Sequence, residues 1–296
     1  LDLDSGTLNL GGTFNTASFN SLDRDGVAAG TLALTGALDN TGATLLLDDS
    51  TGAVLLSGSI TGGTLRANNP AGGALVMNGV GYLIDTTLAG VNGVTGSGLY
   101  VVGNGQSMEA RGTLTLDGAT VRLASTGSST YLRGNTSAGL TTLNIAGNGS
   151  IDFAGADNAN NDLTAWHGNS TLNVGAGIAL TGSQSGGIFM GVGGTFSGTA
   201  TASTAGKTLA FSGSNWNNAG TLRAAGGTVS LTSSTNTTWA SSGTLDLDSG
   251  TLNLGGTFNT ASFNSLDRDG VAAGTLAISG ALDNTGATLL LDDSTG

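Results

Sequence analysis

The chain has 296 residues, a formal net charge of −12, 53 glycines, one proline and no cysteine. The absence of cysteine excludes disulfide bonds and thiolate metal sites. With only eight Lys and Arg residues we expect no nucleic-acid partner, because no basic patch can neutralise phosphates. Apolar residues make up 38% of the chain and charged residues 9%, which disfavours disorder, and no apolar run approaches the ~18 residues of a membrane span.

The first 52 residues return at the end of the chain. Residues 245–296 repeat residues 1–52 at a constant offset of 244 residues (245 − 1), and the copies differ only at Leu34/Ile278 and Thr35/Ser279. A duplication at one fixed offset is typical of a tandem array. We therefore expect one continuous solenoid segment over residues 1–296, with a repeat unit at 1–244 and the start of the next repeat at 245–296.

Short segments with alternating apolar residues recur along the chain. They begin at Thr7, Thr31, Ala53, Ala74, Gly98, Thr120, Thr142, Asp162, Gly187, Thr208, Thr228 and Thr251. The intervals between them are 20 to 25 residues, and eleven intervals cover the 244 residues of one repeat. Alternation with period two predicts short strands with one buried face, and the Gly, Asn, Asp and Ser residues between them permit sharp corners.

Such strands, stacked at ~4.8 Å, predict an all-β fold: a parallel β-helix (β-solenoid) with two or three strands per coil and about eleven coils per repeat. The residues predicted to point inward are Leu8, Leu32, Val54, Leu75, Leu99, Val121, Leu143, Leu163, Ile188, Leu209 and Val229, with Leu10, Leu34, Leu56, Met77, Val101, Leu123, Ile145, Ala165, Met190, Phe211 and Leu231 beside them. The alternative is a string of β-sandwich domains, which requires linkers and strands of ~5–6 residues. The single proline, Pro70, and the short apolar segments favour the β-helix.

Three Gly-, Asn- and Thr-rich runs carry a family resemblance: GTLNLGG (6–12), SGSITGGTLRANN (57–69) and SGALDNTGATLLLDDSTG (279–296). In these runs, and in composition over its whole length, the chain resembles the passenger repeats of filamentous-haemagglutinin-type and autotransporter-type bacterial surface adhesins. The resemblance implies a right-handed β-helix, export to the cell surface, and a role in adhesion or in an extracellular filament.

Two functional hypotheses follow. The first is a structural repeat segment of an extracellular bacterial filament or giant surface protein, which contacts further copies of itself end to end and side to side in adhesion, matrix or sheath formation. The second is the stalk of a secreted adhesin whose receptor-binding head, for surface glycans or a host receptor, lies outside this segment. A more distant alternative is a β-helical protein that binds or cleaves polysaccharides.

We expect no enzymatic activity and no cofactor, because the residues needed for acid–base chemistry are isolated. His167 is the single histidine, Lys207 is the single lysine, and Arg122 is predicted to point outward from its strand. Six aromatic residues that could stack on sugars are scattered along the chain: Tyr82, Tyr100, Tyr131, Trp166, Trp216 and Trp239. Their scatter favours packing under loops over a carbohydrate-stacking surface.

The acidic residues suggest one metal site, for calcium. Residues 1–52 hold seven Asp and one Arg, with Asp2, Asp4, Asp23 and Asp25 in two short clusters. Calcium binds carboxylate and carbonyl oxygens on flexible loops, and the DRDG run around Asp23 is a fragment of such a loop. The complete EF-hand pattern is absent. The alternative is that these aspartates are solvated at turns and on an outward face.

Overall fold

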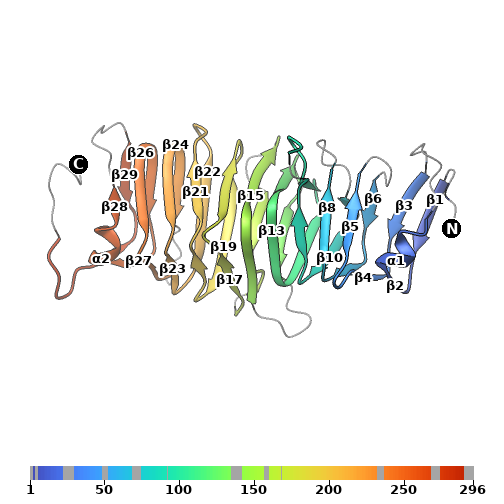
Figure 1. The fold of residues 1–296 in the computed structure, drawn as a ribbon. Helices are drawn as coiled ribbons and strands as arrows, with labels where there is room; N and C mark the ends of the chain where they lie inside the picture. Colours follow the sequence, from blue (N-terminus) through green and yellow to red (C-terminus); the bar gives the residue numbers. More distant parts are fainter. Residues whose placement is uncertain are drawn as a thin grey trace.

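The computed structural model describes residues 3, 6–22, 30–48, 53–68, 75–91, 93–134, 142–156, 160–167, 169–231, 237–267 and 274–289. The fold is the predicted one, an all-β parallel β-solenoid, and the chain runs along a rod from one end to the other (Figure 1). Within these residues, 28 strands share one sheet, and β27 and β30 form a second. The helices among them are two single turns, α1 (Thr16–Phe19) and α2 (Thr260–Phe263).

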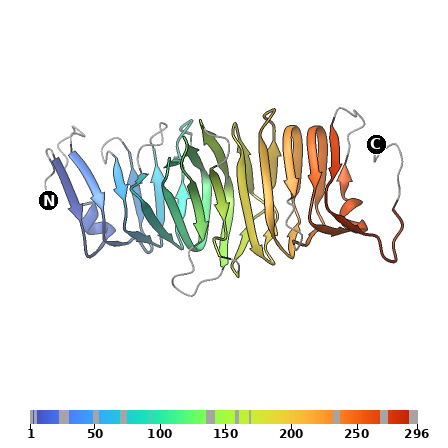
Figure 2. The ribbon, with the colours of Figure 1, turned by 180° about the vertical axis from the view of Figure 1, so that it is seen from behind.

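The chain winds through three parallel ladders, which we call faces A, B and C. Views from opposite sides show the strands of successive turns lying side by side along the rod (Figures 1 and 2). Four long strands bend from one face to the next and so belong to more than one: β13 (Ser107–Ser125), β15 (Thr142–Gly155), β24 (Thr221–Leu231) and β26 (Thr244–Leu254). These bends join the faces into one sheet.

Face A contains β1 (Gly6–Leu10), β3 (Gly30–Leu34), β6 (Val54–Leu56), β9 (Leu75–Met77), β12 (Leu99–Gly103), the ends of β13 and β15, β18 (Ile178–Gly182), β21 (Thr199–Ala202), the starts of β24 and β26, and β28 (Leu266–Asp267). Face B contains β2 (Thr13–Asn15), β4 (Ala37–Asp39), β7 (Ser59–Thr61), β10 (Val80–Ile84), the start of β13, β14 (Thr130–Gly134), β16 (Asn161–Thr164), β19 (Gly186–Val192), β22 (Thr208–Ser214), the ends of β24 and β26, and β29 (Thr275–Ile278). Face C contains β5 (Thr44–Leu47), β8 (Thr64–Ala67), β11 (Thr87–Ala89), the middle of β13, the start of β15, β17 (Thr171–Val174), β20 (Thr195–Phe196), β23 (Trp216–Asn218), β25 (Trp239–Ser241), β27 (Thr257–Asn259) and β30 (Ala281–Asp283).

Alternation within the strands separates an inward apolar set from an outward set, as predicted. The predicted inward residues from Leu32 to Met77 and from Val121 to Leu231 are buried. Leu8 and Leu10 are half-buried and pack against the same core, because they lie in the first strand of the described stack. Burial of these columns on all three faces fills the interior of the rod.

One predicted pair was wrong by one residue. Leu99 and Val101 were expected inside, but Tyr100 and Val102 are the buried residues, and Val101 pairs with Val76 in the outward row. The Tyr100 hydroxyl lies 2.6 Å from the Leu65 carbonyl oxygen and 3.0 Å from that of Ala89. Because its polar end has partners inside the rod, the ring can be buried without an unsatisfied hydroxyl.

The number of turns per repeat is close to ten rather than eleven. Val121 stacks on Ile151 of the same face, whereas Leu143 stacks on Gly112 and Leu172 of face C. Val121 lies on face A, Leu143 on face C and Leu163 on face B. Because the chain runs from face A to B to C, the intervals from Val121 to Leu143 and from Leu143 to Leu163 each advance by two faces and not by the three faces of a complete turn. Each covers two thirds of a turn, so the repeat spans ten and a third turns.

This fraction places the two copies of the duplicated stretch on different faces. The strand β1 lies on face A, whereas its copy, the end of β26, lies on face B, and α1 recurs as α2 with the same Asn N-cap. Likewise β2 is on face B and its copy β27 is on face C. The second copy is therefore turned by one face relative to the first.

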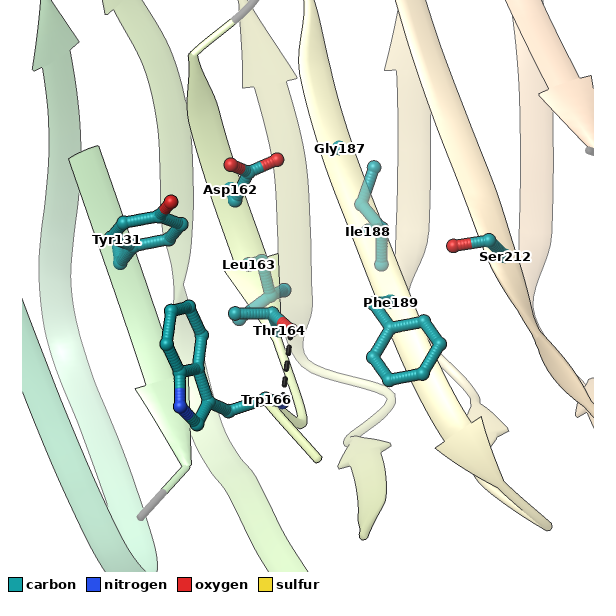
Figure 3. A pocket seen from close by; sticks show the side chains of 9 residues that line it. All are labelled: Tyr131, Asp162, Leu163, Thr164, Trp166, Gly187, Ile188, Phe189 and Ser212. Atoms are coloured by element: carbon teal, nitrogen blue, oxygen red, sulfur yellow. Dashed lines mark hydrogen bonds between the residues drawn. The ribbon is translucent and has the colours of Figure 1, made fainter. Parts of the chain in front are cut away.

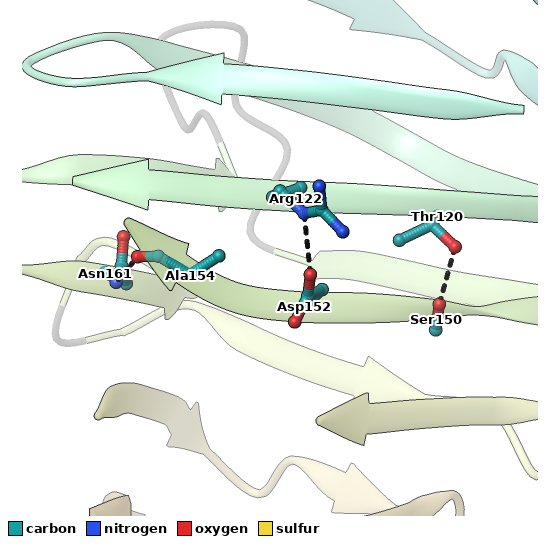
Figure 4. A network of polar contacts seen from close by, with 6 residues as sticks. All are labelled: Thr120, Arg122, Ser150, Asp152, Ala154 and Asn161. Atoms are coloured by element: carbon teal, nitrogen blue, oxygen red, sulfur yellow. Dashed lines mark hydrogen bonds and ion pairs between the residues drawn. The ribbon is translucent and has the colours of Figure 1, made fainter. Parts of the chain in front are cut away.

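Glycine and buried asparagine shape the corners. At the A–B corner, a Cβ on Gly58 would lie 2.0 Å from the Gly36 carbonyl oxygen, so only glycine permits this approach of successive turns. Buried Asn161 accepts a hydrogen bond from the Ser125 N–H (3.0 Å) and donates one to the Ala154 carbonyl (2.9 Å; Figure 4). These contacts satisfy backbone groups at the C-terminal ends of β13 and β15.

Aromatic rings form a stack inside the C-terminal half. Trp216 lies between Phe211 and Trp239, with ring centroids 5.7 and 6.3 Å apart, and Trp239 stacks on Phe258 at 4.8 Å. The Trp239 indole N–H donates to the Gly255 carbonyl oxygen at 2.8 Å. The stack crosses several turns and therefore ties them together.

We expect Trp216→Ala to lower the free energy of unfolding by about 3–5 kcal/mol, because it opens a large cavity between two stacked rings. Urea denaturation measures the change. Val192→Ala, at an apolar side chain that is 40% exposed, is the control and should change it by less than about 0.5 kcal/mol. Equal effects for the two variants would contradict a stabilising role for the stack.

Candidate functional site

The candidate site is a pocket on the outside of face B. In the β14–β16–β19 ladder, Tyr131 pairs with Asp162 and Asp162 with Gly187; two residues further on, Thr164 pairs with Phe189. Side chains at these positions point outward, because the intervening residues Leu132, Leu163 and Ile188 are buried in the core. The residues line an open pocket of about 250 Å³, to which Ser212 of β22 also contributes.

Trp166 follows β16 in a strained and exposed position. Its φ of 73° is in the left-handed region, which costs a bulky residue about 1–3 kcal/mol, and 41% of the residue is exposed. The Trp166 N–H donates to Thr164 Oγ1 at 2.9 Å, and the Ser170 hydroxyl donates to the His167 carbonyl at 2.7 Å. These two bonds hold the turn that projects the indole beside the pocket.

The indole ring is fixed by its neighbours. Tyr131 meets it edge to face at a centroid distance of 5.1 Å, and the Arg133 guanidinium lies 4.0 Å from its centroid. Arg133 also binds Glu109, with Nε 2.8 Å from Oε1 and a second contact from Nη2. Because Glu109 compensates the charge of Arg133, the guanidinium serves to orient Trp166 and adds no net charge beside the pocket.

Asp162 places a carboxylate at the upper edge of the pocket, across from Ser212 (Figure 3). It lies against Gly187, where a Cβ would come within 2.3 Å of Asp162 Oδ1. Among the described residues no group donates a hydrogen bond to this carboxylate. Burial raises its pKa from the ordinary 3.8 to about 6. The pocket therefore combines aromatic rings with one ionised acceptor at neutral pH.

The scattered aromatic residues have different surroundings. Trp216, Trp239 and Tyr100 are buried in the core, so they pack inside the rod rather than under loops as predicted. Tyr131 and Trp166, however, come together on one surface, which the prediction of scatter did not anticipate. Their separation in the chain reflects one long turn, because Tyr131 and Asp162 are ladder partners 31 residues apart (162 − 131). A regular spacing of 20 to 25 residues could not reveal that contact.

The proposed calcium ligands Asp2, Asp4, Asp23 and Asp25 lie outside the described residues, so the calcium site stays a prediction. In the second copy, the counterparts of the first two, Asp246 and Asp248, contact Arg223, with Nε 3.3 Å from Asp246 Oδ2 and 2.9 Å from Asp248 Oδ2. Over the described ranges, no three His, Cys, Asp or Glu side chains are grouped as a metal site would require. No helix in those ranges is long and apolar enough to cross a membrane.

The raised pKa of Asp162 predicts a pH-dependent effect of Asp162→Asn. Folded Asp162 binds its proton more tightly than the unfolded chain does, so its contribution to stability is present below about pH 4 and is lost as the pH rises through about 6. The melting temperature of Asp162→Asn minus that of the wild type should therefore increase between pH 5 and 7.5.

Asp39→Asn is the matched control. The Asp39 side chain accepts a hydrogen bond from the Thr41 N–H, and hydrogen bonds from Thr41 hold its pKa below the ordinary value. Asp39 is thus ionised in both states throughout pH 5 to 7.5, and its substitution should give a constant difference. A constant difference for Asp162→Asn as well would show that burial does not perturb this carboxyl.

Comparison with models of known protein families, with curated proteins and with solved structures finds no match to this chain. The fold is a β-solenoid, and the duplicated stretch and the face B pocket are its two distinctive features.

Proposed function

We propose that this chain is a structural repeat segment of an extracellular bacterial filament or giant surface protein, exported to the cell surface, where it serves in adhesion, matrix or sheath formation. One observation carries the proposal. The second copy of the duplicated stretch continues the ladder of the first repeat without a break, because the start and end of β24 pair in parallel with the start and end of β26. A third copy can extend the rod by the same contacts.

The junction between repeats is also complementary in charge. Arg223 belongs to the last turn of the first repeat, and it contacts Asp246 and Asp248, which open the second. The same sequence positions in the first copy are Asp2 and Asp4. In an array, each acidic start would thus meet the arginine of the preceding repeat, which favours stacking in register over contacts in other registers.

The fractional number of turns supports a fibre whose surface is alike on all sides, because equivalent positions of successive repeats lie on different faces. With ten and a third turns per repeat, each repeat is rotated by one face, about 120°, and rises ~50 Å at ~4.8 Å per turn. Each acidic position would thus recur on a different face in successive repeats, as Asp39 on face B and its counterpart Asp283 on face C already do. Like charges of one fibre would then be distributed around the rod, which maintains solubility on every side.

The first test is the length of arrays. Chains of one, two and three consecutive 244-residue repeats should appear in electron micrographs as straight rods that lengthen by ~50 Å per repeat. The increment follows from continuous stacking of turns. Beads joined by flexible connections, or increments that vary between molecules, would contradict the proposal.

The second test is the junction arginine. Arg223→Gln should lower stability by no more than about 1 kcal/mol, because its side chain is 43% exposed, but should reduce hydrogen-exchange protection over residues 244–254. Arg122→Gln is the matched control, since it breaks an ion pair of similar exposure, Arg122–Asp152 at 2.7 Å, within the repeat (Figure 4). Protection at 244–254 should persist in that control. If Arg223→Gln leaves it intact as well, the junction does not depend on this contact.

A further inference from the structure

We propose that the face B pocket binds one sugar unit of a neutral polysaccharide. The inference goes beyond a structural role, because a rod needs no cavity on its surface. It rests on four residues: Trp166 and Tyr131 on one side, Phe189 on the other, and Asp162 between them (Figure 3).

The aromatic side chains provide the apolar contact. The C–H groups of a pyranose ring pack on aromatic rings, and an exposed indole is the largest such surface. Trp166 is kept exposed at φ 73° although this backbone conformation is unfavourable for it. Strain of this kind persists where the surrounding structure enforces it, commonly at ligand sites. Arg133 and Tyr131 hold the ring in place before any ligand arrives, which reduces the entropic cost of binding.

The polar groups suit hydroxyl donors. The carboxylate of Asp162 has no hydrogen-bond donor among the described residues, so both of its oxygens can accept from the hydroxyls of one sugar. Across the pocket, the Ser212 hydroxyl can donate or accept. A cavity of about 250 Å³ is smaller than the ~300–1,000 Å³ of sites for drug-sized ligands, which fits a single ring of a longer chain.

The charges favour a neutral sugar over an acidic one and over a cation. Asp162 would repel a sugar carboxylate, and the guanidinium that lies against Trp166, that of Arg133, is already bound to Glu109. A ligand ammonium group is disfavoured because Arg133 lies against the same indole at 4.0 Å, so a second cation would share that ring with a like charge.

The test uses the whole 296-residue chain, isothermal titration calorimetry and tryptophan fluorescence. Cellotetraose, β-1,4-mannotetraose and chitotetraose are the neutral probes; tetragalacturonate and tetramethylammonium are the charged ones. We expect at least one neutral probe to bind and to shift the emission of Trp166, because Trp216 and Trp239 are buried. The charged probes should bind more weakly than that neutral probe.

Substitutions in the pocket distinguish a loss of sugar binding from a loss of stability. Trp166→Gly should weaken binding at least about tenfold, the equivalent of one lost aromatic contact, while the melting temperature is kept or raised, because glycine adopts φ 73° without strain. Gly187→Ala should also weaken binding, since its Cβ would displace the Asp162 carboxylate. Tyr82→Ala, an outward tyrosine on the same face with Arg111 over its ring, should leave binding unchanged.

Three results would overturn the proposal: no binding of any neutral probe, undiminished binding by Trp166→Gly, or a charged probe that binds more tightly than all three neutral ones. None of these results bears on whether the repeats stack into a filament, since the pocket lies within the repeat and away from the junction.

Discussion

The parallel hydrogen-bonded ladder between successive turns is the constraint on which the rest of this structure depends. Every turn must place its strands one strand spacing from the turn before, at matching levels on three faces. That requirement explains the corner glycines, such as Gly58, where the carbonyl oxygen of the preceding turn leaves no space for a Cβ. It also explains the inward apolar columns, because the interior of a narrow rod excludes water.

The ladder leaves two properties of each turn free. One is the outward side chain of each strand, which faces solvent and does not have to fill the core. The other is the length of the connection at a corner, which can grow without disturbing the strands on either side. The face B pocket uses both freedoms. Outward residues of β14, β16 and β19 line it, and the turn after β16 projects Trp166 beside them.

Turn length also decides how repeats are arranged. A duplication in sequence is not a duplication in orientation unless the repeat contains a whole number of turns. Here the long turns near β13 and β15 make the repeat ten and a third turns, so β1 and its copy in β26 face different directions. The core still continues across the junction, because each of the three faces presents the same kind of apolar column to the next turn.

The sequence by itself determined the recurring strand segments, the inward residues of all but one of the eleven segments for which it predicted them, and the class of fold, because alternation with period two marks a half-buried strand wherever it occurs. It did not determine the face on which a strand lies, since the three faces share one pattern. On one strand it also predicted the wrong set of inward side chains. There Tyr100 points inward, because two carbonyl oxygens from other turns accept hydrogen bonds from its hydroxyl. Tyr131, Asp162, Trp166 and Phe189 meet only because the turns between them have particular lengths, and those lengths are decided by how the corners pack in three dimensions.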